Sequence, residues 1–407
     1  MVLLKAIAGL ALLSLLLTSA IPQTLAASPR PREQIPAGGS TCLEGGTSGL
    51  QVQRNMSVAV IKPVFTSTPY SEYPTGSFYA FYKKYVQATG NITTDLGWLT
   101  TSVKLGMGYQ GGWGHTFPLY QFLSSSAARN CGLVMGKNLG IISDINVTQG
   151  ALFNPDGARR FDALVIGHTE YVTQTEYDQL RLFVAAGGRL VAMSSNMFYG
   201  RVTYDPVTML ETFRAGHGGY GFNGVTAWHS KTVSFARNTS EWMGSSYCCF
   251  HRFTYSGGVA NASNTIGHAL KQYYGGILDP AYTTHEENAV TNFTRTSVVA
   301  TFHSRAGLIV AAYIHRYVKG SVFCLCVFGE DSIYSDPSTQ YFLVASIAGP
   351  IPAGLGFTQP SHGAGAMFFM FGEVGLVIAL LATPTVFLLW RYAGHRKHQP
   401  FSAATTL

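Results

Sequence analysis

The chain has 407 residues, of which 47% are hydrophobic and only 12% are charged, and its formal net charge is +7 at pH 7. So large an apolar fraction is enough to build a core, which excludes an intrinsically disordered chain. The basic residues form no run between the two ends of the chain, so the sequence offers no positively charged surface for a nucleic acid.

Both ends of the sequence carry patterns typical of membrane targeting. Residues 1–26 combine a lysine, an apolar stretch and small residues at a cleavage position, which predicts a secretory signal peptide. Residues 366–390 are apolar over a length that crosses a bilayer, and the basic tail 391–407 follows. By the positive-inside rule the tail is cytoplasmic, and the rest is an extracellular domain anchored in the cell membrane. Residues 27–56 and 350–365 are interpreted as a linker and a stalk, because they are rich in proline and glycine.

Two further features agree with an extracellular location. Six N-x-S/T sequons predict N-linked glycans, at Asn55, Asn91, Asn146, Asn238, Asn261 and Asn292. An oxidising location also permits disulfides, although sequence does not determine their pairing, among Cys42, Cys131, Cys248, Cys249, Cys324 and Cys326. Cys324 and Cys326 face the same side of an apolar strand and are poor partners, whereas the vicinal Cys248 and Cys249 are expected to take separate partners. A zinc site is the alternative, but the sequence has no C-x-x-C pair.

The domain over residues 57–349 begins with alternating strand and helix signals. Residues 57–65 form an apolar run that predicts a first strand, with pairing that ends at Pro63. Residues 77–88 and 116–128 predict helices, because their apolar side chains recur at helical spacing. Residues 139–142 predict a second short strand.

A strand, a capped helix and another strand come next. Residues 161–166 are an apolar run of strand length, and Thr173 with Glu176 forms an S/T-x-x-E capping box that opens a helix. Gly187 and Gly188 end the helix, and residues 189–193 form the next apolar strand. A unit of this length predicts a right-handed crossover between two parallel strands.

Polar residues follow the carboxyl ends of these strands. His168 and Glu170 come just after the first strand, and Asn196 just after the second. Open α/β sheets bind their ligands along this edge, so the three side chains are candidates for one site. Glu330 and Asp331 join the same rim if the strand before them belongs to the same sheet.

The remaining sequence is mixed. Residues 204–297 show no clear period and are interpreted as an insertion of loops and short strands. Residues 297–302, 307–314 and 321–328 predict apolar strands, and residues 340–348 predict a closing helix. The expected fold is an open, mostly parallel α/β sheet flanked by helices, with a β-rich insertion and one C-terminal transmembrane helix.

The segment from Gly167 to Tyr171, its capped helix, Gly187–Gly188 and Ser195–Asn196 resembles the C-terminal domain of the large (β) subunit of N,N-dimethylformamidase. That domain is similar in fold to class I glutamine amidotransferases and to ThuA-like proteins. The strand and helix around residues 320–349 also resemble the end of ThuA-like proteins, which usually carry histidine where Glu330 or Asp331 stands. The resemblance covers about residues 57–349 and is greatest to archaeal membrane-anchored surface proteins.

The resemblance implies roles for individual residues. The formamidase holds a mononuclear iron through two tyrosines and a glutamate, with a histidine and an asparagine nearby. Carried over, Glu170 is the carboxylate ligand, His168 an acid/base, and Asn196 an amide that orients substrate or water. Tyr79 and Tyr82 are the candidates for the tyrosine ligands. Phenolate and carboxylate oxygens are the ligands that a hard iron ion prefers.

The same residues also fit structural roles. Glu170 can orient the His168 imidazole without catalysis, and Asn196 can form an Asx-turn after its strand. Tyr79 and Tyr82 also suit one face of a helix that packs in the core. The other histidines, His115 among them, have no ligand spacing and are expected to be ordinary surface or core residues.

Two functions therefore stand side by side. One is a hydrolase of small amides or related C–N bonds, with a metal-activated water or with Glu170 as general base. The other is a non-catalytic, glycosylated surface or envelope protein that binds a ligand on the same fold. The sequence has no G-x-S-x-G motif and no cysteine beside Gly167, so serine and cysteine nucleophiles are excluded.

Overall fold

A computed structural model describes residues 42–43, 50–71, 102–105, 113–216, 239–251, 258–278, 285–290, 293–304, 307–326, 333 and 336–349. The chain divides into two units, residues 1–40 and 41–407, and all of these residues belong to the second. The expected signal peptide, stalk, membrane segment and tail lie outside the described residues, as do Tyr79 and Tyr82. Among the described helices, none is long and apolar enough to cross a membrane.

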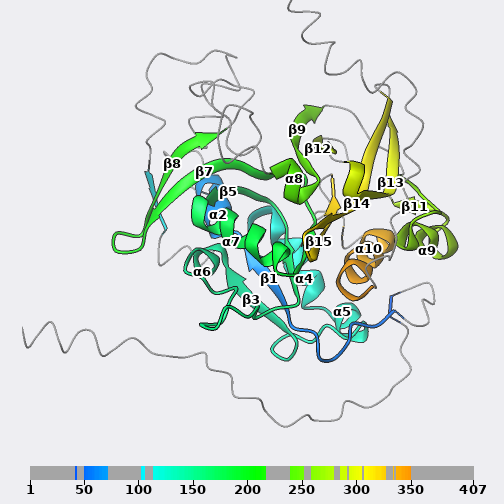
Figure 1. The fold of residues 1–407 in the computed structure, drawn as a ribbon, viewed down its shortest axis with the longest axis horizontal. Helices are drawn as coiled ribbons and strands as arrows, with labels where there is room; N and C mark the ends of the chain where they lie inside the picture. The colour runs from blue at the N-terminus through cyan, green and yellow to red at the C-terminus, as the bar shows by residue number, and fades with distance from the viewer. Residues whose placement is uncertain are drawn as a thin grey trace, which may run out of the picture. The chain divides into compact units, whose positions relative to one another are not determined.

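The core of the fold is a nine-stranded sheet with the order β11-β10-β13-β14-β15-β6-β4-β1-β3 (Figure 1). Five neighbouring strands are parallel: β3 (Leu139–Ser143), β1 (Val58–Lys62), β4 (Ala163–Ile166), β6 (Arg189–Ala192) and β15 (Gly320–Leu325). The other four are antiparallel to their neighbours: β14 (Gly307–Tyr317), β13 (Thr296–Ser304), β10 (Gly258–Ala260) and β11 (Ile277–Leu278).

The expectation of a mostly parallel sheet is therefore correct for only about half of the sheet. Connections of two residues join β13 to β14 and β14 to β15. A connection this short can only reverse the chain, so these strands must pair antiparallel. The segment 204–297 is also more than an insertion, because it supplies β10 and β11 to the main sheet.

The predicted crossover is confirmed. Helix α7 (Gln174–Ala185) joins β4 to β6, and the two strands pair in parallel. The Thr173 hydroxyl accepts a hydrogen bond from the Glu176 amide and so caps the helix. Glu176 does not complete a capping box, because both of its carboxyl oxygens are buried without a hydrogen-bond partner. After the helix, Gly187 has φ +101°, a conformation that strongly favours glycine.

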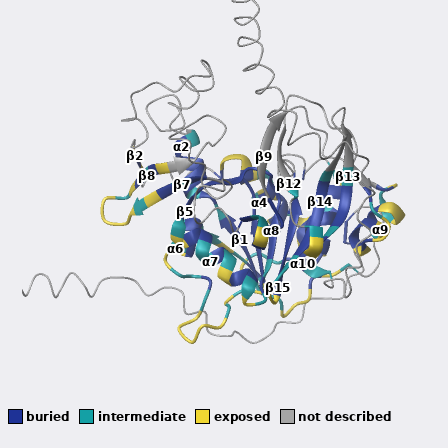
Figure 2. Cartoon of the chain, turned by 45° about the horizontal axis from the view of Figure 1, so that its top comes forward, coloured by how far each residue is buried: buried dark blue, intermediate teal, exposed yellow. Residues whose placement is uncertain are grey.

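Helices cover both faces of the sheet, and the strands between them are buried (Figure 2). One core contains Val60, Val165 and Phe323, packed against α4 (Phe117–Leu123) and α10 (Pro337–Ala348). The other contains Ala59, Ile61 and Leu164, packed against α7 and α8 (Thr239–Met243). Val60 faces one core while Ala59 and Ile61 face the other, because successive side chains of a strand point to opposite faces of the sheet.

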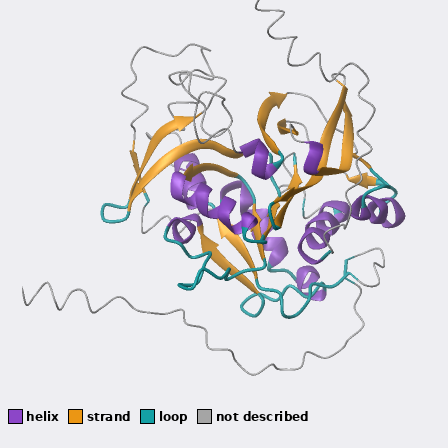
Figure 3. Ribbon diagram, viewed as in Figure 1, coloured by secondary structure: helices purple, strands orange, loops and turns teal. Residues whose placement is uncertain are grey.

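A smaller four-stranded sheet has the order β2-β8-β7-β5, and Figure 2 labels its strands. Figure 3 distinguishes the strands of the fold from its helices by colour. Its strands are β2 (Ser102–Lys104), β8 (Leu210–Gly216), β7 (Met197–Asp205) and β5 (Thr169–Thr173). A third pair is formed by β9 (Ser245–His251) and β12 (His285–Val290). The segment between β10 and β13 also contains the helix α9 (Thr265–Tyr273) and the 3-10 turn η6 (Phe293–Arg295).

Several local predictions need correction. The first strand ends at Lys62, and α2 (Val64–Ser71) begins where the sequence predicted more strand. The predicted helix 116–128 is three pieces, the 3-10 turn η3 (Gly114–Thr116), α4 and α5 (Ser126–Asn130). The break follows from Ser125, whose hydroxyl caps α5 by accepting from the Ala128 amide. The strand at 139–142 and the closing helix at 340–348 are confirmed as β3 and α10, whereas residues 77–88 lie outside the described residues.

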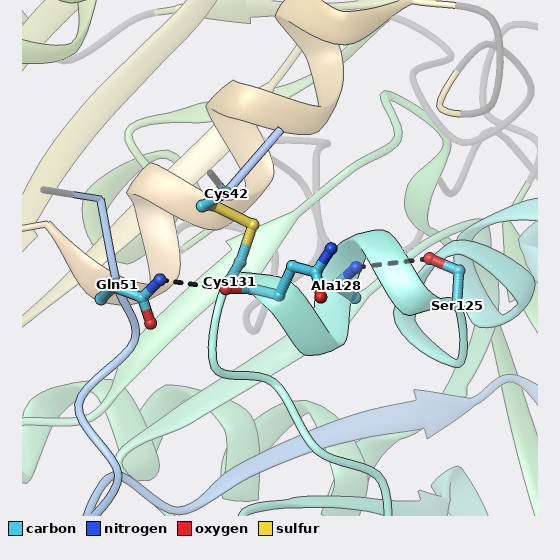
Figure 4. Close-up of a disulfide and its surroundings, with 6 residues drawn as sticks. Cys42, Gln51, Ser125, Ala128 and Cys131 are labelled. Atoms are coloured by element: carbon cyan, nitrogen blue, oxygen red, sulfur yellow. Dashed lines mark hydrogen bonds between the residues drawn. A yellow bond between two sulfur atoms is a disulfide. The ribbon is translucent and has the colours of Figure 1, made fainter. Parts of the chain in front are cut away.

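Among the described residues, Cys42 and Cys131 form a disulfide (Figure 4). It ties the segment before β1 to the end of α5, where Gln51 also donates to the Asn130 carbonyl at 2.9 Å. Cys324 and Cys326 lie on one face, as expected, with their sulfurs 3.9 Å apart and no disulfide between them. The side chains of the vicinal pair at 248 and 249 lie outside the described residues.

Three carboxyl groups are fully buried between the small sheet and the helices beside it. Asp144 begins α6 (Asp144–Thr148) and accepts from the Phe65 amide at 2.8 Å, which anchors the start of α2. Glu176 lies in the first turn of α7, and Glu211 in β8, and neither has a hydrogen-bond partner among the described residues. Burial raises the pKa of Asp144 to about 8. The pKa values of Glu176 and Glu211 are raised well above their usual range, chiefly by burial and to a smaller extent by repulsion from Asp144.

These groups predict a fall in stability as pH rises. Above about pH 4 the unfolded chain releases the protons that the folded protein keeps, so folding stability is lost progressively toward the raised folded-state pKa values. Each carboxyl that is still protonated in the folded state contributes a loss of about 1.4 kcal/mol per pH unit. Glu176→Gln and Glu211→Gln carry no such proton, so between pH 5 and pH 8 each variant should lose up to about 4 kcal/mol less folding stability than the wild type loses.

Urea unfolding at the two pH values measures this difference. Glu241→Gln, which alters an exposed carboxyl in α8, is the matched control and should follow the wild type. Parallel losses in all four proteins would contradict the account of the buried acids.

Candidate functional site

The site lies where two neighbouring strands leave the main sheet and enter the small one. β4 continues into β5, and β6 continues into β7, and both pairs are parallel. His168 lies at the first break and Asn196 at the second, joined by a hydrogen bond from the Thr169 amide to the Asn196 carbonyl at 3.2 Å. The two breaks are adjacent because the strands are adjacent, so the polar residues after them meet.

The three residues expected at the sheet edge converge on one carboxylate oxygen. Asn196 Nδ2 donates to Glu170 Oε2 at 3.0 Å, and His168 Nε2 lies 3.3 Å from the same oxygen. All three side chains are buried, Glu170 with only 1% of its surface exposed. A carboxylate removed from water needs donors of this kind to stabilise its charge.

A third donor, Tyr70, was not predicted from the sequence. Its phenol donates to the same Glu170 oxygen, and its ring packs edge-on against the His168 imidazole with centroids 5.1 Å apart. Tyr70 comes from α2, which begins directly after β1 at the same edge of the sheet. The Thr66 hydroxyl accepts from the Tyr171 amide at 3.0 Å and so holds α2 against β5.

A cavity of about 480 Å³ opens beside Tyr70 and His168, the side chains that contact Glu170. It is lined by Pro63, Thr66, Ser67, Tyr70, Trp113, Gly114, His115, Phe117, Pro118 and His168. His115, expected to be an ordinary histidine, lies at the site, with its ring centroid 5.2 Å from that of His168 and 5.9 Å from that of Tyr70. No periodic pattern marks this residue, because it lies in a 3-10 turn of three residues.

The turn η3 is held beside the site by close contacts at two glycines and by one pair of stacked rings. A Cβ at Gly167 would lie 2.6 Å from the Thr116 hydroxyl, so only glycine lets the end of β4 approach η3 this closely. Gly114 has φ +49° and lies against Ser67 of α2. Trp113 stacks on Tyr120 with ring centroids 4.5 Å apart and planes within 10°. These contacts fix the wall of the cavity relative to Glu170.

The described residues contain no group of three or more histidine, cysteine, aspartate or glutamate side chains placed to bind a metal. Two oxygens of the kind that bind metal ions do meet here, one from the Tyr70 phenol and one from the Glu170 carboxylate. Asn196 Oδ1 is buried without a hydrogen-bond partner among the described residues. Tyr79 and Tyr82, the predicted tyrosine ligands, and Glu330 and Asp331, the further rim residues, lie outside the described residues.

The Gly167 contact predicts a specific effect of adding one methyl group. Gly167→Ala should force η3 away from the end of β4, with a loss of about 1–3 kcal/mol in the free energy of unfolding. Gly140→Ala in β3 is the matched control, because a Cβ there meets only the Val58 carbonyl at 4.0 Å. Urea unfolding of both variants checks the difference, and equal stabilities would show that the contact is not tight.

Comparison with known proteins gives one family and several distant folds. The family described as N,N-dimethylformamidase beta subunit-like, C-terminal, matches residues 47–275. No curated protein matches the chain.

Similar solved structures include a putative ThuA-like protein from Bacteroides uniformis, with 11% identity over 59% of this chain and 86% of that one, and a TM-score of 0.36. A cytoplasmic protein from Salmonella typhimurium has 12% identity over 52% of this chain and 81% of that one, with a TM-score of 0.32. A β-galactosidase from Rahnella sp. R3 has 13% identity over 52% of this chain, with a TM-score of 0.34. The chain spans only 24% of the length of that β-galactosidase.

Proposed function

The chain belongs to the N,N-dimethylformamidase beta subunit-like, C-terminal family, and on that premise we propose that it hydrolyses small amides or related C–N bonds at Glu170. The observation that supports this proposal best is the convergence of Tyr70, His168 and Asn196 on one buried carboxylate oxygen. This arrangement lies beside a cavity large enough for a small-molecule substrate.

The donor set suits the iron that the family implies. Phenolate and carboxylate oxygens are hard ligands, and the Tyr70 and Glu170 oxygens already meet at one point. Tyr70 and Glu170 would hold the ion, and Tyr79 or Tyr82 remains the proposed source of a second phenolate. When bound, such an ion is a Lewis acid that polarises an amide carbonyl and lowers the pKa of water. Without an ion, Glu170 is the proposed general base.

The other side chains have distinct proposed tasks. His168, whose Nε2 lies 3.3 Å from Glu170 Oε2, is the proposed acid/base: its imidazole accepts a proton and returns it during hydrolysis. The Asn196 amide group donates to Glu170 through its nitrogen. Its buried oxygen has no partner among the described residues and is the proposed acceptor of a hydrogen bond from a water or a substrate N–H.

We also propose that this domain works outside the cell. Residues 1–26 have the pattern of a signal peptide, and residues 366–390 followed by the basic tail have the pattern of a membrane anchor. Of the predicted glycan sites, Asn55 and Asn146 are exposed, as an N-linked glycan requires. Asn261 is a less suitable glycan site, because its Nδ2, the atom that would carry the glycan, donates to the Val298 carbonyl at 3.0 Å.

Metal content and amide hydrolysis of the purified full-length protein test the proposal together. The wild type should contain near-stoichiometric iron by mass spectrometry and hydrolyse N-methylformamide. Glu170→Gln keeps the shape of the side chain but removes the anionic ligand, so it should lose the iron and at least about 10²-fold of the rate.

Glu241→Gln, on the exposed face of α8, is the control and should keep both properties. A well-folded wild-type protein with neither metal nor hydrolysis would contradict the proposal and favour a non-catalytic role as a ligand-binding surface protein.

A further inference from the structure

The cavity beside Glu170 is larger than the smallest amides require. Its volume of about 480 Å³ corresponds to roughly sixteen water molecules at the density of the liquid. A molecule as small as dimethylformamide fills only a fraction of this space. A substrate that uses the whole cavity must therefore carry a larger substituent on one side of the amide bond.

The two sides of the cavity differ in chemistry. His168 and Tyr70, which contact Glu170, form its polar end. The wall formed by the start of α4 and the residues before it carries the apolar side chains of Trp113, Phe117 and Pro118, with His115 as its polar member. Phe117 keeps 44% of its surface exposed, so a large apolar ring is held in contact with solvent at this wall. Burying such a surface against a ligand is favourable, since it removes apolar area from water.

Packing against neighbouring residues holds this apolar wall in place. Trp113 is fixed by stacking on Tyr120, and the turn that follows it is fixed by the glycine contacts at Gly114 and Gly167. Pro118 lies in the first turn of α4, where its ring rigidifies the chain. A preformed apolar surface binds a ligand without a cost for ordering itself.

We propose that the site takes amides whose nitrogen carries an aryl or similarly large apolar group, seated against Trp113, Phe117 and Pro118. The inference rests on the proposed hydrolysis at Glu170. The amide group lies at the polar end of the cavity, beside the Tyr70 and His168 side chains that contact Glu170, and the nitrogen substituent extends along the apolar wall. Hydrolysis adds water across the C–N bond: the water oxygen bonds to the acyl carbon, the nitrogen takes a proton, and a carboxylic acid and an amine leave.

A pair of matched substrates tests this assignment. N-benzylformamide and N-methylformamide release amines that differ in basicity, but this difference is the same in every variant, so a preference that falls in Phe117→Ala reports the binding of the phenyl group rather than the leaving group. The wild type should prefer N-benzylformamide by about 10- to 100-fold, as burial of an aromatic ring predicts. Phe117→Ala should reduce kcat/KM for N-benzylformamide by about tenfold and change that for N-methylformamide less than about twofold.

Leu182→Ala is the matched control, because Leu182 is an exposed apolar residue of α7 that does not line the cavity. Phe117→Leu is a second variant that keeps part of the apolar surface and should retain an intermediate preference. Because Phe117 is exposed, neither substitution at this position should prevent folding, and thermal unfolding verifies this.

The possible outcomes separate the inference from the proposed function. Hydrolysis with a preference for N-benzylformamide that falls in Phe117→Ala supports both. Hydrolysis with equal rates for the two substrates, or with a preference unaffected by Phe117→Ala, overturns the inference and leaves the proposed function intact. No hydrolysis of either formamide overturns both, and binding of N-benzylformamide without turnover would then identify a ligand-binding role.

Discussion

The structure around the site depends on one buried carboxylate. Glu170 has only 1% of its surface exposed, and a charge in such a place is costly unless donors surround it. Tyr70, His168 and Asn196 meet at one of its oxygens, and each lies in a segment that follows the carboxyl end of a different parallel strand. The order of strands β1, β4 and β6 in the sheet is therefore what brings a tyrosine, a histidine and an amide to one point.

Buried acids elsewhere in the fold have a different environment. Glu176 and Glu211 are as fully buried as Glu170, yet neither has a hydrogen-bond partner among the described residues. Burial raises their pKa, so they favour the neutral form, whereas Glu170 accepts hydrogen bonds from Tyr70 and Asn196 and lies beside His168. Asp144 links the two regions, because it anchors the start of α2, the helix that carries Tyr70. The acid groups beside the site thus bear on its stability rather than on its chemistry.

The sequence predicted the part of the site that local patterns control. The unit β4-α7-β6 has a capping threonine, an amphipathic stripe and terminating glycines, and the rule about carboxyl ends then places His168, Glu170 and Asn196. Tyr70 could not be found in this way. Residues 64–71 include Pro69 and several hydroxyl residues and have little intrinsic helix propensity. Contacts with Asp144 and Tyr171, distant in sequence, make this segment a helix.

Other features needed tertiary structure for the same reason. His115 lies in a three-residue turn, which has no period to detect, and close contact at Gly167 positions it. The small sheet extends β4 and β6 past the main sheet, so a segment that reads as a polar loop is the strand β5. The antiparallel pairing of β13, β14 and β15 follows from connections of two residues, which the apolar runs alone did not reveal.

The account depends on Glu170 and Tyr70 forming one oxygen-rich centre. The most direct measurement is a crystal structure of the iron-reconstituted protein, with diffraction recorded at the iron absorption edge. The account predicts an anomalous peak in contact with the Glu170 carboxylate and the Tyr70 phenol. A structure in which Tyr70 still donates directly to Glu170, with no iron peak beside them, would contradict it.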